Sequence, residues 1–263
     1  MFYIILVVAS ILTGFINTLA GSGSLIMLPL LMAAGLPANI ANGTNRVATL
    51  VQSIVGVGTF VRNKKMDIKD SQLPIGVCVV GAFFGAFIAT RTDPAFLKQF
   101  IKYLMIVMFF VILVKPKRWF KEADIASNKH KHPLTLILLF FAGVYAGFIQ
   151  AGIGIILLAI LVLRADFSLP YANFVKLVIV LVYALPVLII FVADNEVNWK
   201  LGGITACGQG LGAFLGARFA TRYKNVQIWI YRLLVFVVFS AIIYLFKDDL
   251  GRLLGIDLSI QPA

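Results

Sequence analysis

Hydrophobic residues gather in ten continuous stretches that are separated by short polar segments. The stretches lie at about 2–18, 22–35, 38–61, 71–90 and 95–114, and then at 133–149, 152–164, 169–193, 201–220 and 226–246. Apolar residues run without alternation, and a backbone that crosses lipid must satisfy its own hydrogen bonds, so the pattern predicts helices rather than barrel strands. The fold class that we expect is an all-α polytopic membrane protein.

The first five stretches resemble the second five in sequence. Residues 81–91 read GAFFGAFIATR and residues 212–222 read GAFLGARFATR, identical at eight of eleven positions with an offset of 131. At the same offset, Ala20, Gly21 and Gly23 recur as Ala151, Gly152 and Gly154, and Ala41-Asn42 recurs as Ala172-Asn173. A constant shift across separated motifs indicates a tandem duplication. We therefore expect two homologous repeats, 1–114 and 133–263, joined by a basic linker at 115–132.

An odd number of spans in each half would place the two repeats upside down relative to each other. Residues 62–70 carry four basic side chains, whereas their counterpart at 193–201 carries two acids and one lysine. Because basic residues mark cytoplasmic loops, this exchange predicts inverted topology with the linker in the cytoplasm. The stretches at 22–35 and 152–164 are short for a core about 30 Å thick. If both were re-entrant, each half would cross four times and the repeats would be parallel.

Composition narrows the class of protein further. With 61% apolar and 13% charged residues, the chain would precipitate as a soluble globule. The net charge of +12 resides mostly in loops beside the apolar stretches, which argues against nucleic acid as a partner. Cys78 and Cys207 fall within apolar stretches and are expected to be small buried hydrophobes. The first stretch lacks a basic leader, so we expect a retained span in a multi-pass protein of the cell inner (plasma) membrane.

A turn of small residues precedes the short second stretch of each half. The first turn contains Gly21, Ser22, Gly23 and Ser24, and the second contains Gly152 and Gly154 directly after Gln150. A helix that begins inside the membrane presents free N–H groups and the positive end of its dipole, which together bind anions. Glycines at such places also serve close helix packing, which is the alternative interpretation.

Polar side chains follow one face of the third stretch and, more sparsely, of its counterpart. They are Asn42, Asn45, Arg46, Thr49 and Ser53 in the first half, and Asn173 and Lys176 in the second. A cation within an apolar helix is costly unless a negative group pairs with it or water hydrates it. A long basic side chain can also extend to the membrane interface. All eleven acids lie in loops or at the ends of stretches, so no carboxylate is available to neutralise these cations. We expect an anionic substrate to be their partner, and cation transport is disfavoured.

The remaining sequence motifs give no evidence of a catalytic or metal-binding site. The sequence offers no Ser-His-Asp set, paired carboxylates or phosphate-binding loop within the apolar stretches, so we expect no catalytic residue, no enzyme and no cofactor. His130 and His132 lack Cys or carboxylate companions, so we expect no metal site. Gly-x-x-x-Gly spacings at 81–85, 208–212 and 212–216 are typical of close helix contact. Gln209 and Thr205 near them either line a pathway or bond to neighbouring backbone.

These motifs resemble those of the TauE/SafE family of sulfite exporters and organosulfur-anion permeases. The resemblance covers nearly the whole chain, and its most specific element is the Asn-Gly-Thr-Asn-Arg run at 42–46 after Leu36-Pro37. It implies transport of sulfur-containing anions such as sulfite or organosulfonates, with site roles at Asn42, Thr44, Asn45, Arg46 and Lys176 and at both glycine turns. Ser22 and Ser24 depart from a more glycine-rich family pattern and add hydroxyl donors.

The sequence thus predicts a transporter, exporter or permease, of small sulfur-containing oxyanions that works by alternating access around a site at the middle of the membrane. The expected partners are the anion and the lipid bilayer. Two alternatives remain open, namely a passive anion channel and a non-transporting membrane scaffold or assembly protein. The sequence also leaves open the direction of transport, the coupling ion and whether copies of the chain form a homo-oligomer.

Overall fold

A computed structural model describes residues 2–63, 68–113, 128–222, 235 and 238–246, and within them every regular element is a helix. The α-helices are α1 (Phe2–Ala20), α2 (Ser24–Ala33), α3 (Ala38–Asn63), α4 (Gln72–Thr90), α5 (Pro94–Leu113), α6 (Pro133–Phe148), α7 (Ile153–Leu163), α8 (Leu169–Ala193) and α9 (Trp199–Arg222). Short 3-10 turns occupy Lys69–Ser71 and Asn128–Lys131, and residues 238–246 are also helical. The all-helical prediction is confirmed. Most of the linker at 115–132 and of the stretch at 226–246 lies outside the described residues.

The helices differ in length relative to the thickness of a membrane. By length and composition, α4, α5 and α8 are each long and apolar enough to cross a membrane. In contrast, α2 has 10 residues and α7 has 11. At about 1.5 Å per residue, each covers roughly half of a hydrocarbon core. The prediction that the second stretch of each half is short is therefore confirmed.

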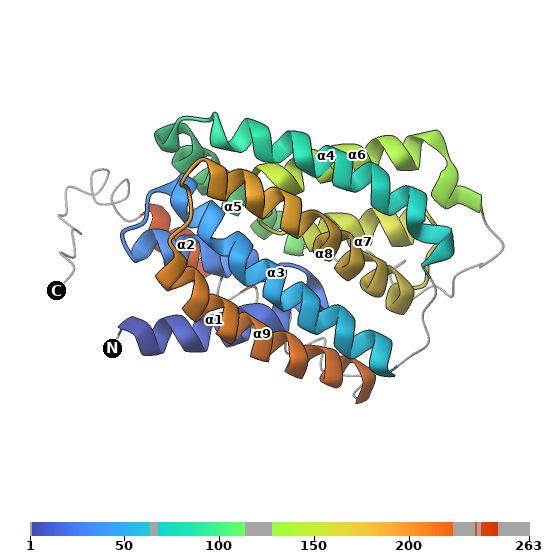
Figure 1. Ribbon diagram of the computed structural model, residues 1–263, viewed down its shortest axis with the longest axis horizontal. Helices are drawn as coiled ribbons and strands as arrows, with labels where there is room; N and C mark the ends of the chain where they lie inside the picture. The colour runs from blue at the N-terminus through green and yellow to red at the C-terminus, as the bar shows by residue number, and fades with distance from the viewer. Residues whose placement is uncertain (1, 64–67, 114–127, 223–234, 236–237, 247–263) are drawn as a thin grey trace.

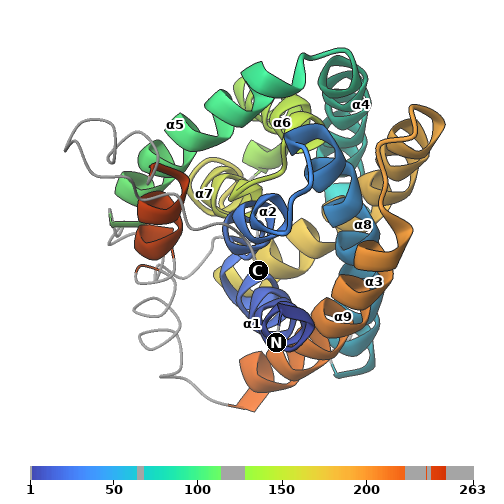
Figure 2. The ribbon, with the colours of Figure 1, turned by 90° about the vertical axis from the view of Figure 1, so that its left-hand side faces the viewer.

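Two of the long helices, α3 and α8, run in opposite directions through the molecule (Figure 1). Asn39 near the start of α3 donates to Glu196 just after α8 at 2.8 Å, and Ser71 just before α4 lies 2.8 Å from Tyr171 at the start of α8. Seen along the helices, α2 and α7 lie in the interior of the bundle (Figure 2). The short helices are therefore enclosed by the long ones.

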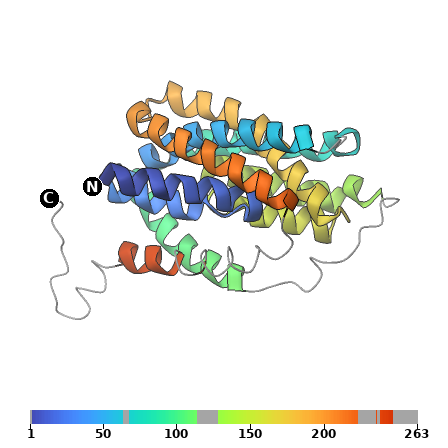
Figure 3. The ribbon, with the colours of Figure 1, turned by 90° about the horizontal axis from the view of Figure 1, so that it is seen from below.

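Glycine allows two pairs of helices to touch backbone to backbone. A Cβ at Gly85 of α4 would lie 1.9 Å from the carbonyl oxygen of Val144 on α6. A Cβ at Gly212 of α9 would lie 2.0 Å from the carbonyl oxygen of Ile11 on α1. Figure 3 shows α1 and α9 side by side along much of their length. The interpretation of the Gly-x-x-x-Gly spacings as packing contacts is confirmed.

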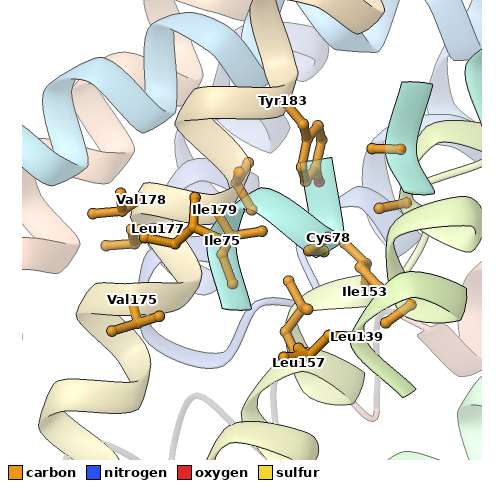
Figure 4. Close-up of a cluster of buried hydrophobic side chains, with 14 of the residues drawn as sticks. Ile75, Cys78, Leu139, Ile153, Leu157, Val175, Leu177, Val178, Ile179 and Tyr183 are labelled. Carbon is orange, nitrogen blue, oxygen red and sulfur yellow. The ribbon is translucent and has the colours of Figure 1, made fainter. Parts of the chain in front are cut away.

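An apolar cluster fills the space between α4, α6, α7 and α8. Cys78, Leu157, Ile179 and Tyr183 are all within it and fully buried (Figure 4). Cys78 is therefore the small buried hydrophobe that was expected. The same expectation is wrong for Cys207, which is exposed on α9. An apolar residue on the outer face of a membrane helix needs no protein neighbour, because lipid is an equally apolar surrounding.

The connection between α8 and α9 packs against the first turns of α3. A Cβ at Gly43 would lie 2.1 Å from the carbonyl oxygen of Glu196, and the Asn198 amide donates to the Thr44 hydroxyl at 2.9 Å. The Glu196 side chain is only 8% exposed. Burial raises the pKa of its carboxyl above the usual value, the hydrogen bond from Asn39 opposes the rise, and Asp194 adds to it.

The α4–α6 contact yields a first prediction. Gly85→Ala should lower the free energy of unfolding by about 1–3 kcal/mol, because the new methyl group must push two helix backbones apart. Gly76→Ala on the same helix is the matched control, since nothing lies within 4 Å of a Cβ there. Thermal unfolding of the purified proteins in detergent measures both. Equal midpoints for the two variants would contradict the described contact.

The buried carboxyl yields a second prediction. Because folding raises the pKa of Glu196, its ionisation costs stability, which is lost as the pH rises from the unfolded-state value near 4.5 through the raised folded-state value. Glu196→Gln removes this loss and retains an acceptor for Asn39. The variant should therefore gain thermal stability over the wild type at neutral pH and gain less at acidic pH. A gain that does not change with pH would refute the assignment.

Candidate functional site

The polar face of α3 is directed into the protein. Asn42, Asn45, Arg46, Thr49 and Ser53 are each no more than 1% exposed. They lie on one face because residues three or four apart are neighbours on a helix. The prediction that this stripe does not face lipid is confirmed, and the alternative that Arg46 snorkels to the interface is excluded.

Arg46 holds the carboxyl end of α6. Its Nη1 donates to the carbonyl oxygen of Ala146 at 2.6 Å, and its Nη2 donates to that of Gly147 at 2.7 Å. Asn42 binds both the Arg46 guanidinium and the end of α6. Its Oδ1 accepts from Arg46 Nη2 at 3.2 Å, and its Nδ2 donates to the Phe148 carbonyl at 2.7 Å. The last carbonyls of a helix lack partners within it and form the negative end of its dipole. The guanidinium therefore caps α6.

Lys176 of α8 caps the carboxyl end of α1. Its Nζ donates to the carbonyl oxygens of Asn17 at 3.2 Å and Thr18 at 3.4 Å. It also donates to Asn173 Oδ1 at 2.6 Å, while Asn173 Nδ2 donates to the Thr18 carbonyl at 3.2 Å. Lys176 is 1% exposed, so it does not snorkel either. Each half of the chain thus supplies an Asn and a cation that cap the first helix of the other half.

The two glycine turns meet in the interior. Gly21 and Gly152 have φ values of +76° and +72°, which glycine adopts without strain. The Gly154 amide donates to the Gly21 carbonyl at 3.0 Å, and a Cβ at Gly154 would lie 2.2 Å from Gly21 Cα. The Ser24 hydroxyl donates to the Gln150 carbonyl at 3.0 Å. Both turns are therefore parts of one contact between the starts of α2 and α7.

The expectation of free amides is wrong for the second turn, and in the first turn the Gly21 amide donates to the Asn17 carbonyl at 2.9 Å. The amide of Gly152 donates to Ser24 Oγ at 3.4 Å, that of Ile153 to the Gln150 carbonyl at 3.3 Å, and that of Gly154 to Gly21. The physical reason is that close approach of the two turns lets each satisfy the other. In the first turn, the fully buried Ser22 hydroxyl has no hydrogen-bond partner among the described residues.

The remaining predicted residues turn elsewhere. Thr44 faces the α8–α9 connection through its bond with Asn198, and Asn45 faces α9, where its Oδ1 accepts from Gln209 Nε2 at 3.3 Å. The Gln150 side chain is 1% exposed, and its Oε1 has no partner within the described parts of the chain. The structure thus gathers the two cations, the two Asn residues that support them and both turns, and it sets Thr44 apart.

Sequence reasoning missed the partners of the cations. It expected an anionic substrate to be their partner, yet helix-end carbonyls accept their hydrogen bonds, and the Phe191 ring lies 5.1 Å from the Arg46 guanidinium carbon. Backbone carbonyls carry no signal in a sequence except where a helix is known to end. Among the described residues, no carboxylate is bonded to either cation, and the buried polar side chains include a single acid, Glu196. No group of three metal-ligating side chains gathers there either.

The arrangement contains groups of the kind that recognise anions. Besides the two cations, it offers buried donors without partners in the described structure, namely Ser22 Oγ, Asn45 Nδ2 and Arg46 Nε. Positive charge and N–H or O–H donors that converge from several helices are the groups that recognise oxyanions.

Comparison with known proteins gives the family. The model of the family described as "Sulfite exporter TauE/SafE" matches residues 6–245. The chain is 31% identical over 215 residues to the "Probable membrane transporter protein YfcA" of Escherichia coli K12, which covers 81% of this chain and 79% of the relative. It is also 31% identical over 251 residues to the "Probable membrane transporter protein ORF9" of a Sinorhizobium species, with 92% of each covered. No solved structure matches. The chain therefore belongs to the TauE/SafE family of membrane transporters.

Proposed function

We propose that this transporter carries a small sulfur-containing oxyanion, such as sulfite or an organosulfonate, across the cell inner membrane by alternating access. The substrate would bind near Arg46 and Lys176, beside the two glycine turns. The single observation that carries the proposal is that two fully buried cations have no carboxylate among their partners in the described structure.

Charge is the first support for an anionic substrate. Each helix end contributes about half an elementary charge, negative at the carboxyl ends of α1 and α6 and positive at the amino ends of α2 and α7. These four ends meet at the two turns, so their contributions oppose one another. The charges of Arg46 and Lys176 therefore remain largely uncompensated. A cation entering this region would be repelled, whereas an anion would relieve the repulsion.

Unused donors are the second support. Leaving a buried polar group without a partner costs about 1–3 kcal/mol. The Ser22 hydroxyl, the Asn45 side-chain amide and Arg46 Nε are three such groups. Ser22 belongs to the first turn, and Asn45 directly precedes Arg46 on α3. The oxygens of a sulfite or sulfonate group can accept hydrogen bonds from all of them. The names of the two relatives support membrane transport, and the description of the family supports a sulfur oxyanion.

Two inverted repeats would supply the motion. The helix pairs α1–α9 and α6–α4 occupy equivalent positions in the two halves, and each pair packs closely through glycine. Likewise α3 and α8 are counterparts that run in opposite directions. Such pairs favour halves that are related by inversion, which allows one half to rock against the other about a central site.

The α1–α2 and α6–α7 pairs are compatible with this inversion. Each short helix leads back from the centre toward the end from which its partner entered (Figure 1). Each pair therefore adds no net crossing, and α3, α4 and α5 leave an odd number of crossings in the first half. The expectation of parallel repeats counted the first helix as a full crossing, so a re-entrant second segment gave four crossings in each half. If α1 and α2 together add no crossing, the count is odd and the repeats are inverted.

The cation contacts suggest how substrate could influence the motion. Arg46 in the first half holds α6, and Lys176 in the second half holds α1, so both contacts link the halves. A bound oxyanion would share these donors with the helix-end carbonyls. Occupancy would thereby weaken the contacts that join the halves in the described conformation.

Removing the charge tests the proposed site. Arg46→Gln and Lys176→Gln keep an N–H donor for the helix-end carbonyls but lose the positive charge. We expect each to lower the flux of radiolabelled sulfite into reconstituted vesicles by about tenfold or more, which corresponds to about 1.4 kcal/mol.

Arg91→Gln is the matched control, since Arg91 is exposed at the end of α4 and lies over Phe87. Its flux should equal that of the wild type. Wild-type flux that saturates with concentration is expected of a carrier and contradicts a channel. Unchanged, saturable flux in both charge-removing variants that fold normally would reject the proposed site.

Inversion is tested by cysteine labelling in oriented membrane vesicles. Arg62 and Ala193 are exposed at the ends of α3 and α8 and lie 131 positions apart. We expect Arg62→Cys to react with an impermeant thiol reagent from the cytoplasmic side and Ala193→Cys to react from the opposite side. Labelling of both from one side would mean that the repeats are parallel.

A further inference from the structure

A buried polar interface joins α1, α3 and α9 on one side of Arg46 and Lys176, which we call the cation pair. Its members are Thr13 and Asn17 of α1, Asn45, Thr49, Gln52 and Ser53 of α3, and Thr205 and Gln209 of α9. Except for the half-buried Asn17, each is no more than 1% exposed. Two bonds cross between helices, from Asn17 Nδ2 to Gln52 Oε1 at 3.1 Å and from Gln209 Nε2 to Asn45 Oδ1 at 3.3 Å.

This interface is incompletely satisfied. Thr13 Oγ1, Asn45 Nδ2, Ser53 Oγ and Gln209 Oε1 are buried without a hydrogen-bond partner among the described residues. Each such group costs about 1–3 kcal/mol, and lipid offers no water to offset it. Four of them in one interface are more than packing alone would retain. They indicate that the interface receives water or a polar ligand.

The equivalent interface of the other half shows that the fold does not require these polar groups. At the offset of 131, Thr13, Thr49, Gln52 and Ser53 correspond to Val144, Val180, Tyr183 and Ala184, while Gln209 corresponds to Cys78. These counterparts lie between α4, α6 and α8, where Cys78 and Tyr183 belong to the apolar cluster of Figure 4. The same packing of three helices thus buries four polar groups without partners in one half, and in the other half only the Tyr183 hydroxyl among these counterparts in the described structure.

The polar interface also adjoins the cation pair. Asn45 is next to Arg46 in the chain, and the Asn17 carbonyl accepts from Lys176. A Cβ at Gly23 of the first turn would lie 2.2 Å from the Thr13 carbonyl oxygen. From Asn45 to Ser53 the interface continues for about two helical turns along α3, toward the end that carries Arg62.

We propose that the interface of α1, α3 and α9 is the part of the passage, from Asn45 to Ser53, by which a small oxyanion and its water move past the cation pair in the direction of Arg62. The inference rests on the proposed anion transport and adds its route. The Asn45 amide and the Thr13 and Ser53 hydroxyls donate to the oxyanion or to its water, and Gln209 Oε1 accepts from water. In the described conformation the equivalent interface of α4, α6 and α8 offers no such passage, because Val144, Ala184 and Cys78 stand where the first interface has Thr13, Ser53 and Gln209. The counterpart of Asn45 is Lys176, which caps α1.

Thiol accessibility tests the route with matched variants. In protein lacking both native cysteines, Ser53→Cys is compared with Ala184→Cys, its counterpart 131 positions away, which is also buried. Thr49→Cys and Val180→Cys form a second pair in case Ser53→Cys does not fold. Cys207→Ala alone leaves Cys78 as a native reporter of the apolar interface.

We expect Ser53→Cys to react with the anionic reagent sulfonatoethyl methanethiosulfonate about tenfold or more faster than Ala184→Cys or Cys78, since thiols in apolar surroundings stay protonated and inert. The cationic trimethylammonioethyl reagent should react more slowly at Ser53→Cys, because the cation pair repels it. Methanesulfonate, which does not cleave mixed disulfides, should slow the anionic reaction.

The result separates the route from the transport activity, because sulfite flux is measured on the same vesicles before labelling. Flux together with an inert Ser53→Cys and an inert Thr49→Cys would overturn the route and leave anion transport intact. Equal reactivity at Ser53→Cys and Ala184→Cys would overturn the proposed asymmetry. Fast, anion-selective labelling of Ser53→Cys supports the passage even if none of the tested anions is transported, in which case it is the proposed function that fails.

Discussion

The structure depends on one reciprocal interaction, in which a buried cation of each half holds the carboxyl end of the first helix of the other. Arg46 binds the end of α6 and Lys176 binds the end of α1, each beside a supporting Asn. Helix ends inside a membrane leave carbonyls without partners, which lipid cannot supply. The two cations meet this need and fix the positions of both glycine turns.

The same interaction places positive charge where charge is most expensive. The carbonyls at the ends of α1 and α6 accept the hydrogen bonds of the two cations. The partial negative charge of these helix ends is offset by the partial positive charge at the starts of α2 and α7, so the charges of the cations remain largely uncompensated. A structural role and the proposed binding role therefore coincide in the same side chains. The polar groups between α1, α3 and α9 continue from this region along α3, whereas the equivalent positions of the other half include Cys78 and Tyr183 of the apolar cluster.

Periodicity and length predicted the helices well, because an apolar run must be helical in lipid and its polar flanks mark its ends. The polar stripe at Asn42, Asn45 and Arg46 could likewise be read from spacing alone. The cap on α6 could not, because its acceptors are backbone carbonyls whose position depends on tertiary packing. The mutual contact of Gly21 and Gly154, which uses amides expected to be free, and the outward direction of Cys207 were hidden for the same reason.

The most direct measurement of the central claim is the thermal unfolding of purified protein in the presence of sulfite or methanesulfonate, compared with the uncharged isostere dimethyl sulfone at constant ionic strength. If the cation pair binds an oxyanion, the anions should stabilise the protein saturably, by about 2.7 kcal/mol at a concentration one hundred times the dissociation constant. Dimethyl sulfone should have no such effect. Absence of stabilisation by either anion, or equal stabilisation by the sulfone, would contradict the account.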